Sequence, residues 1–370
     1  MIDVDVHNDW TTAEVLFPYM NKNFIDYMTR GELPGPRGTF PHANRPFPHP
    51  EGFMRYDISE DGRPGAHFKI MKEKLLDRYN HDIAVLNGEE GIEAHTLAHP
   101  DYASALCQAH NDWMLDTWLT YDPRFRGSLI VAPQDPTGAA AEIRRVGDRE
   151  EFVQVLVSSG SYRPYGNPVY HPIWEAAAEV GLPVAIHLGG HGGMNYNPIS
   201  CGPTTYFWET HALLAQNGQT QMASLIVQGV FEKWPSLKFL IIECGVAWAA
   251  PILWRLDADW KALRKETPWV KRLPSEYFRD HIRLASQPLE RPKHREHLLA
   301  VLEAIDGKHT LMFASDYPHW DFDDPNLLAI PKDWRENVFH NNALDFYGDR
   351  LKRYLAKRSA DAEDMAVAAD

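Results

Sequence analysis

IDVDVH, residues 2–7, is the stretch from which the fold can be deduced. Side chains alternate between the two faces of a β-strand, so the aliphatic residues share one face while Asp3, Asp5 and His7 share the other. The apolar face suits packing against helices, whereas a face made of acids and an imidazole needs a polar interior. A strand with these two faces is typical of a closed barrel whose polar residues point inward.

Seven further short runs rich in β-branched residues follow the first, and longer stretches of helical character separate most of them. Alternation of strand and helix gives parallel strands joined by crossover helices. Including the first, the runs span residues 2–7, 82–88, 127–133, 152–159, 183–190, 238–245, 281–287 and 310–318. Eight strands predict an α/β fold of the (β/α)8 TIM barrel type, with a doubly wound open sheet as the alternative.

The segments between these runs hold predicted helices and two long insertions. Residues 171–181 predict an amphipathic helix that ends at Gly181, and residues 220–235 predict a second helix. The insertion 31–67 is rich in Pro and Gly and is expected to lie over the barrel mouth as a lid or a subunit contact. The insertion 191–219 follows the fifth strand on the same face and is expected to shape a substrate pocket.

The composition predicts one ordered globular domain. Hydrophobic residues make up 44% of the 370 residues and aromatic residues 12%, which is not the composition of a disordered chain. Because α/β barrels of this size fold as one unit, residues 1–355 are expected to form a single domain. Residues 356–370 have little to bury and are expected to be a frayed tail.

Charge and sequence pattern exclude several classes of partner. A formal net charge of -14 argues against nucleic acids and anionic membranes, which both need concentrated Lys and Arg. No apolar run reaches the ~20 residues that span a bilayer, and the start of the chain lacks the pattern of a signal peptide. Cys107, Cys201 and Cys244 lie too far apart in sequence for a disulfide framework or a thiolate zinc site. We expect a cytoplasmic protein that acts on a small molecule.

Three of the predicted strands end in Asp or His with the same inward parity. Asp5 and His7 lie on the first strand, His187 ends PVAIH, and Asp316 ends LMFASD. A lone strand histidine is more often a core residue, but several buried acids and imidazoles together need a compensating charge, which a divalent cation supplies. This mixed nitrogen and oxygen set predicts a single metal ion, with Zn²⁺ favoured and Mn²⁺ or Fe²⁺ as alternatives.

Other candidate residues rest on weaker signals. Asp3 lies deeper on the inner face and is interpreted as a buried hydrogen-bond acceptor rather than a ligand. His319 and His191 follow two of the ligand strands and are candidate catalytic residues, with loop packing as the alternative for His319. Arg163 is a candidate clamp for a substrate carboxylate, and Trp10 is a candidate wall of an aromatic pocket. A solvated charge and a core residue are the respective alternatives for these two.

Five segments taken together resemble a known family. They are VDVH (4–7), GLPVAIHLGG (181–190), FEKWPSLKFLIIECGVAW (231–248), FASDYPHWD (313–321) and ENVFHNNALDFYG (336–348). The combination resembles the amidohydrolase-2 group of the amidohydrolase superfamily, which includes aminocarboxymuconate-semialdehyde decarboxylase and the resorcylate decarboxylases. The resemblance implies a barrel enzyme with one divalent ion.

The resemblance also carries over to individual positions. It implies that Asp5 and His7 are the paired ligands of the first strand, and that His187 and Asp316 complete the set. One position departs from the family, because Glu243 stands where such decarboxylases have a histidine. A buried carboxylate can still act as an acid or a base there, and the alternative is that Glu243 only holds His187 or a nearby loop.

The family resemblance favours a non-oxidative decarboxylase of a small aromatic or unsaturated carboxylic acid. In that reaction Asp316 or Glu243 would carry the proton to the carbon that loses CO2. The alternative is a metal-dependent hydrolase of an amide, an ester or a ring bond that uses an activated water, which a carboxylate at position 243 would suit. A barrel with only a structural metal is the third possibility. The resemblance further implies a homodimer.

Overall fold

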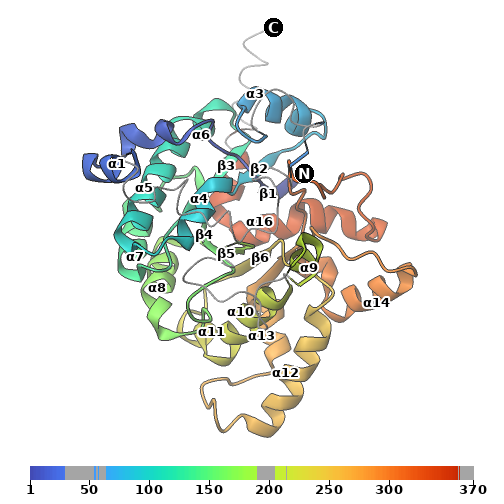
Figure 1. Ribbon diagram of the computed structural model, residues 1–370. Coiled ribbons are helices and arrows are strands. Elements are labelled where there is room, and N and C mark those ends of the chain that lie inside the picture. Colours follow the sequence, from blue (N-terminus) through green and yellow to red (C-terminus); the bar gives the residue numbers. More distant parts are fainter. Residues whose placement is uncertain are drawn as a thin grey trace.

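The computed structural model describes residues 1–29, 54–55, 57, 64–189, 205–213, 215–356 and 358. Eight parallel strands follow one another in sequence order around a single sheet, with helices on the outside (Figure 1). The strands are β1 (Ile2–Val6), β2 (Ile83–Leu86), β3 (Phe125–Ile130), β4 (Phe152–Ser158), β5 (Val184–His187), β6 (Phe239–Ile242), β7 (Ile282–Ala285) and β8 (Leu311–Met312). All eight predicted strands are present.

Backbone hydrogen bonds between the first and last strand segments close the sheet. Val4 N donates to Phe313 O at 3.0 Å, and Asp316 N donates to Asp5 O at 3.1 Å. A ring of this kind leaves no open edge. The predicted (β/α)8 barrel is therefore confirmed, and the doubly wound open sheet is excluded.

Helices and short helical turns fill the connections between the strands. The α-helices of six or more residues are α1 (Lys22–Thr29), α5 (Pro100–Asp116), α7 (Pro136–Val146), α8 (His171–Val180), α9 (Phe207–Leu213), α10 (Ala215–Val227), α12 (Ala249–Leu263), α13 (Pro274–His281), α14 (Arg295–Ala304) and α16 (Asn342–Tyr347). The remaining elements are shorter α-helices and helical turns of other types: η1 (Ala13–Tyr19), α3 (Phe68–Met71), η2 (Lys72–Asp77), α4 (Glu89–Glu93), η3 (Ala94–Thr96), α6 (Trp118–Tyr121), η4 (Pro168–Tyr170), α11 (Val230–Lys233), α15 (Gly307–Thr310), η5 (Lys332–Trp334) and η6 (Asn337–Asn341).

Two glycines in left-handed backbone conformation decide where the two predicted helices end. The helix predicted over 171–181 is α8, and Gly181 follows it with φ 69°. The single helix predicted over 220–235 is wrong, because Gly229 with φ 77° separates α10 from α11. A left-handed residue cannot continue a right-handed helix, so the amphipathic pattern extends across a break in the backbone.

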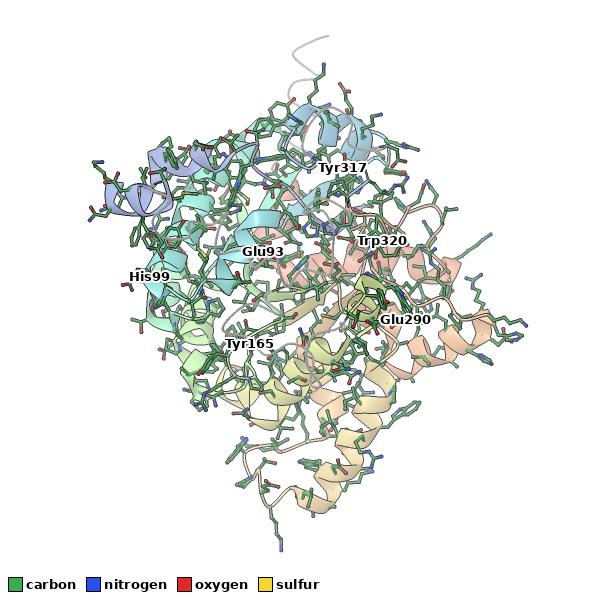
Figure 2. All side chains as sticks on the ribbon, in the orientation of Figure 1. Glu93, His99, Tyr165, Glu290, Tyr317 and Trp320 are labelled. Atoms are coloured by element: carbon green, nitrogen blue, oxygen red, sulfur yellow. The ribbon has the colours of Figure 1, made fainter. Side chains whose placement is uncertain are left out.

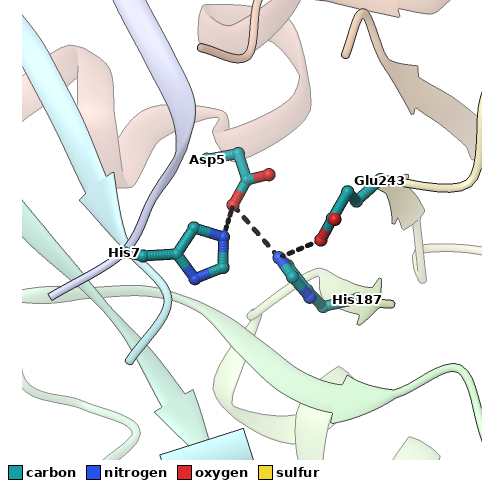
Figure 3. Close-up of side chains that lie close together, drawn as sticks. All are labelled: Asp5, His7, His187 and Glu243. Carbon is teal, nitrogen blue, oxygen red and sulfur yellow. Dashed lines mark hydrogen bonds and ion pairs between the residues drawn. The ribbon is translucent and has the colours of Figure 1, made fainter. Parts of the chain in front are cut away.

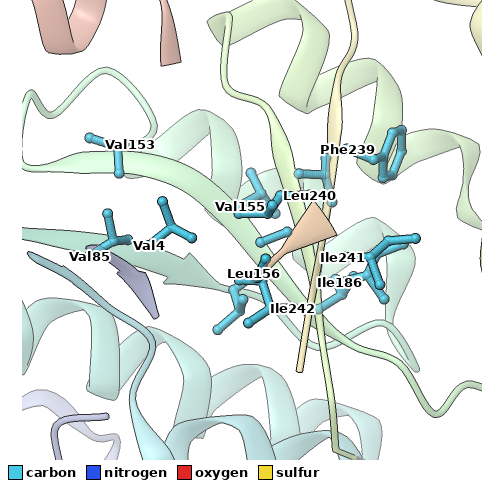
Figure 4. Close-up of a cluster of buried hydrophobic side chains, with 14 of the residues drawn as sticks. Val4, Val85, Val153, Val155, Leu156, Ile186, Phe239, Leu240, Ile241 and Ile242 are labelled. Carbon is cyan, nitrogen blue, oxygen red and sulfur yellow. The ribbon is translucent and has the colours of Figure 1, made fainter. Parts of the chain in front are cut away.

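Aliphatic side chains of the strands form a continuous core with the surrounding helices (Figure 4). Val155, Ile186 and Ile241 are at most 2% exposed, and burial of each such side chain contributes about 1.5–3 kcal/mol. Cys107 and Cys244 are buried free thiols, as expected, whereas Cys201 lies outside the described residues. None of the helices in the described residues has the length and apolar character needed to cross a bilayer.

Most of each insertion lies outside the described residues, and so does the tail beyond residue 358. In the insertion predicted as a lid, Met54 forms an antiparallel bridge with His319, and Arg55 N donates to Pro318 O at 2.8 Å. This part of the insertion therefore runs beside the loop that follows β8. In the second insertion, the described part contains α9 and the start of α10.

We expect alanine to be tolerated differently at the two left-handed glycines. Gly181→Ala should lower the free energy of unfolding by about 1–2 kcal/mol, because a Cβ in this conformation is strained but meets nothing within 4 Å. Gly229→Ala should lower it by roughly a further 1–3 kcal/mol, since its Cβ would approach Trp269 Cδ1 at 2.5 Å. Urea unfolding of both variants measures the difference, and equal losses would contradict the packing argument.

Candidate metal centre

Acidic and histidine side chains from several strands converge at the C-terminal end of the barrel. Asp5, His7, His187 and Glu243 each offer a ligand atom, and these atoms all lie within 4.8 Å of one another (Figure 3). All four side chains are buried. Asp5 lies on β1 and His187 ends β5, while His7 and Glu243 directly follow β1 and β6. The inward direction predicted for Asp5 and His187 from strand alternation therefore matches the structure.

Both histidines turn the same ring nitrogen toward the centre. His187 Nδ1 lies 2.6 Å from the carbonyl oxygen of Leu188, and His7 Nδ1 lies 2.8 Å from Glu89 Oε2. These acceptors assign the ring proton to Nδ1 in each case. When Nε2 loses its proton, its lone pair faces the cluster, which is the arrangement that metal-binding histidines adopt.

The spacing of the facing atoms fits a shared ion. His7 Nε2 lies 3.4 Å from Asp5 Oδ1 and 3.1 Å from Asp316 Oδ1, and His187 Nε2 lies 3.2 Å from Asp5 Oδ1. Ligand atoms about 2.0–2.1 Å from one tetrahedral ion are roughly 3.4 Å apart. Asp5 Oδ2 and Asp316 Oδ2 are buried and have no hydrogen-bond partner among the described residues. These buried, unpaired oxygens suit a cation.

The electrostatics of the cluster also favour a cation. Burial opposes protonation of His7, but Asp5, Asp316 and Glu89 outweigh it and raise the pKa of the imidazole to about 10. Burial, reinforced by Asp316, raises the pKa of Glu243 well above the usual range. Without an ion, His7 therefore keeps a proton that a histidine in water would lose near neutral pH, and Glu243 keeps a proton that a glutamic acid in water would lose. A divalent ion would replace some of these protons.

Two carboxylates of the site lie on backbone in the left-handed region. Asp316 has φ 59° and Glu243 has φ 58°. The sequence predicts that Asp316 ends the eighth strand. This prediction is wrong, because β8 ends at Met312 and Asp316 lies in the loop beyond it. Its inward direction comes from this turn and from the bond to Asp5 O. Such conformations are uncommon for residues other than glycine, and they cluster at functional sites.

A second set of potential ligands overlaps the first. It contains His7 and Glu243 again, now with Asp316 and His319. His319 stacks on His7 with a ring distance of 4.1 Å, and its Nδ1 lies 2.6 Å from Asp316 Oδ1. Asp316, predicted as a ligand beside Asp5 and His187, thus belongs to this second set, and Glu243 is common to both. His187 Nε2 and Glu243 Oε2 are 3.7 Å apart, too far for a hydrogen bond that would hold His187.

The remaining predicted site residues lie elsewhere or outside the described residues. His191 is outside them. Arg163 is exposed, and its backbone rather than its guanidinium contacts Tyr170, so its function as a carboxylate clamp stays a prediction. Trp10 is 4% exposed and packs edge-on against His110 and Trp113. These contacts support the core alternative for Trp10.

Two residues of the site were not predicted from the sequence. Glu89 begins α4 and contacts His7 and His319, and it has no strand parity that would have indicated its direction. Asn87 follows β2 and donates to Asp5 Oδ1 at 2.6 Å. A polar residue at the end of the otherwise apolar run 82–88 was the available signal for Asn87.

The rim of the site joins the second insertion to the loop that follows β8. His211 on α9 pairs with Asp321 at 3.0 Å, and Gln287 donates to the same carboxylate at 2.9 Å. The ring of His211 also lies edge-on to Trp320, at a distance of 5.3 Å. Trp320, labelled in Figure 2, is half exposed beside α9.

A family model described as amidohydrolase matches residues 2–348. The chain belongs to the amidohydrolase family. A gamma-resorcylate decarboxylase from Rhodococcus jostii is an amidohydrolase relative that is 26% identical over 303 residues, which is 75% of this chain and 82% of the relative. A gamma-resorcylate decarboxylase from a Polaromonas species is 25% identical over 301 residues, covering 74% and 86%.

Solved structures agree with the amidohydrolase fold. The 5-carboxyvanillate decarboxylase from Sphingomonas paucimobilis superimposes with a TM-score of 0.67 at 21% identity, covering 94% of this chain and 98% of the other. A dihydroxybenzoic acid decarboxylase from a Polaromonas species, with bound manganese and 2-nitroresorcinol, gives 0.63 at 19% identity, covering 94% and 96%. The match extends over nearly the whole barrel.

Asp3 is expected to stabilise the junction of β1 with the segment after β8. Its Oδ1 accepts from Ser315 N at 3.0 Å and from Asp5 N at 3.2 Å, and its Oδ2 lies 3.3 Å from His81. Asp3→Ala would leave these buried groups unpaired and should lower the free energy of unfolding by about 1–3 kcal/mol. Urea unfolding of chelator-treated protein measures this loss without any contribution from a bound metal.

The matched control is Asp26→Ala, which removes a surface carboxylate that pairs with Lys22 on α1. An exposed pair of this kind contributes about 0–1 kcal/mol. If Asp26→Ala and Asp3→Ala lowered the free energy of unfolding equally, the proposed role of Asp3 at the junction would be wrong.

Proposed function

We propose that the protein is a non-oxidative decarboxylase of a small aromatic carboxylic acid, with one divalent ion held by Asp5, His7, His187 and Asp316. The observation that carries this proposal is the convergence of the Nε2 atoms of His7 and His187 on buried carboxylate oxygens. The curated relatives, both named as gamma-resorcylate decarboxylases, support the reaction type.

Different residues of the chain would bind the metal ion and transfer the proton in this reaction. A bound divalent ion supplies positive charge that orients the acid and stabilises negative charge during the reaction. Asp5 and His187, fixed by their hydrogen bonds, and His7, held by its ion pair with Glu89, would give that charge a constant position. Glu243, whose pKa burial raises, is a proton carrier within reach of the cluster, and Asp316 and His319 form a second acid and base pair beside it.

The reaction breaks the bond between the ring carbon and the carboxylate. The electron pair stays on the ring carbon, CO2 leaves, and a proton from the chain takes the vacated position. A carboxyl group at Glu243 delivers one proton per turnover and recovers it from water afterwards. The proton gained by the ring carbon replaces the CO2 that leaves, and water supplies that proton through Glu243. No electron acceptor is needed.

Hydrolysis is the competing reaction, and one observation favours it. Glu243 lies in the ligand cluster, where a carboxylate base would be suited to take a proton from water. The two reactions use the same residues but differ in what they release. Decarboxylation releases CO2, whereas hydrolysis adds the elements of water to the product.

The identity of the ion, the oligomeric state and the cellular location belong to the same proposal. Two imidazoles and two carboxylates suit Zn²⁺ and also Mn²⁺, and the Polaromonas decarboxylase contains manganese. We propose that the ion is Zn²⁺, and Mn²⁺ is the alternative to be tested. We also propose that the protein is a homodimer and that it is located in the cytoplasm. Sedimentation of the purified protein tests the dimer.

Elemental analysis should find about one equivalent of Zn or Mn in the purified wild-type protein. His187→Ala and Asp316→Asn should each lose most of that metal, because each removes a proposed ligand. Loss of a residue that only hydrogen-bonds to a metal ligand weakens metal affinity by about 10–100-fold, so loss of a ligand itself should exceed that. His309→Ala, which removes a half-exposed imidazole paired with Asp306, is the matched control and should keep its metal.

These measurements are repeated after chelation and after re-addition of each ion, with circular dichroism to verify the fold. Folded wild-type protein that takes up neither ion would overturn the metal centre. The polar cluster would then be a buried hydrogen-bond network and nothing more.

A panel of hydroxylated benzoic acids, supplied to the metal-loaded protein, should yield CO2 with at least one member. Glu243→Gln should lower the rate by about 10²–10⁴-fold, the usual contribution of a positioned acid or base. Trapped CO2 and product masses in H2¹⁸O provide the readout. Incorporation of ¹⁸O without release of CO2 would replace the decarboxylase by the hydrolase.

A further inference from the structure

The barrel interior below the cluster contains a chain of buried polar side chains. Asn87 donates to Asp5 Oδ1 at 2.6 Å, and Asn87 Oδ1 accepts from Ser128 at 2.6 Å and from Gln154 at 3.2 Å. Gln154 Oε1 accepts from the hydroxyl of Tyr347 at 3.0 Å. The chain therefore extends from β1 across residues of three neighbouring strand segments to α16.

Every member of this chain is buried. Asp5, Asn87, Ser128 and Gln154 have no exposed surface, and Tyr347 is 4% exposed. An interior of aliphatic side chains is the usual filling of such a barrel. Polar groups placed there must satisfy one another, since an unpaired buried polar group costs about 1–3 kcal/mol. The amide oxygens and amide nitrogens of Asn87 and Gln154 all have partners.

The carboxylate of Asp5 fixes the direction of all these hydrogen bonds. Asn87 Nδ2 faces Asp5 Oδ1 and the carbonyl oxygen of Val4 at 3.2 Å, and both can only accept. The amide oxygen of Asn87 must then accept from Gln154. Gln154 is thereby oriented with its own oxygen toward Tyr347, whose hydroxyl must donate. Neither amide can flip without breaking a bond to a buried acceptor.

We infer that this chain holds the carboxylate of Asp5 in a fixed orientation toward the metal centre, with Asn87 as the positioning residue and Gln154 and Tyr347 as its support. The inference rests on the metal centre in the proposed function. Asp5 Oδ1 is the atom that lies 3.4 Å from His7 Nε2 and 3.2 Å from His187 Nε2. The strong hydrogen bond from Asn87 to this atom prevents rotation of the carboxylate and keeps this oxygen between the two imidazoles.

Burial raises the pKa of the Tyr347 hydroxyl well above its ordinary range, with Asp5 and Asp3 adding to the effect. The hydroxyl therefore remains a donor at physiological pH. The hydroxyl of Tyr347 therefore connects the packing of α16 to the orientation of Asp5 on β1.

The test is calorimetric titration of Zn²⁺ and Mn²⁺ into metal-free wild-type protein and into Asn87→Leu. We expect the Kd of the variant to rise by about 10–100-fold, the effect typical of lost partners of metal ligands. Asn111→Leu is the matched control, because Asn111 is an equally buried amide that bonds to Ile130 O and Glu142. It should lose stability but bind both ions with the wild-type Kd.

Tyr347→Phe carries the same test if Asn87→Leu does not fold. It removes only the hydroxyl at the far end, and the Kd should rise by roughly 3–10-fold, since one buried hydrogen bond is lost. Tyr277→Phe, a buried tyrosine that bonds to Glu232 outside the barrel, should leave the Kd unchanged.

The outcomes separate this inference from the proposed function. A wild-type protein that binds neither ion overturns the metal centre and this inference with it. A wild type that binds, with an unchanged Kd in folded Asn87→Leu and in Tyr347→Phe, overturns only the positioning role. Equal losses of affinity in the Asn87 and Asn111 variants would also overturn it, because the effect would then be one of general destabilisation.

Discussion

Repulsion among four carboxylates is the constraint on which the rest of the site depends. Four carboxylates approach three imidazoles within a largely buried volume; the carboxylates are those of Asp5, Glu89, Glu243 and Asp316, and the imidazoles are those of His7, His187 and His319. Like charges this close are stable only if protons or a cation offset them. The barrel makes such a gathering feasible, because it is closed by hydrogen bonds between β1 and the segment after β8. Each carboxylate is thereby anchored on its own strand, loop or helix end.

Sequence reasoning succeeded where a side chain lies on a regular strand. The alternation of IDVDVH gave the inward direction of Asp5, and the alternation of PVAIH gave that of His187, because a strand repeats every two residues. It failed where a turn decides the direction. Asp316 lies beyond the end of β8 in a left-handed conformation, and Glu89 begins a short helix after a loop. Periodicity carries no information on either kind of turn.

The helix predicted over 220–235 failed for a related reason. Its apolar pattern continues past Gly229, so the pattern alone predicts one element, but the backbone at Gly229 is left-handed and separates two helices. The polar chain inside the barrel was also missed. Ser128 and Gln154 were counted within apolar strands, and only their contacts with Asn87 show that they form a layer of their own. Such layers depend on which strands are neighbours, which the fold decides.

The left-handed backbone at Glu243 and Asp316 affects which substitutions this sequence can accept during evolution. A glycine at either position would relax the backbone, and asparagine would tolerate the left-handed conformation at least as well as the carboxylates now present. Both replacements remove a buried carboxyl group from a crowded acidic pocket, so they would favour the metal-free folded state. If these two carboxyl groups act as proposed above, selection for heat resistance alone would enrich inactive sequences, and selection for turnover would retain carboxylates at these two turns. Among variants selected only for stability, the positions at which carboxylates are repeatedly lost would therefore mark the proposed reaction centre.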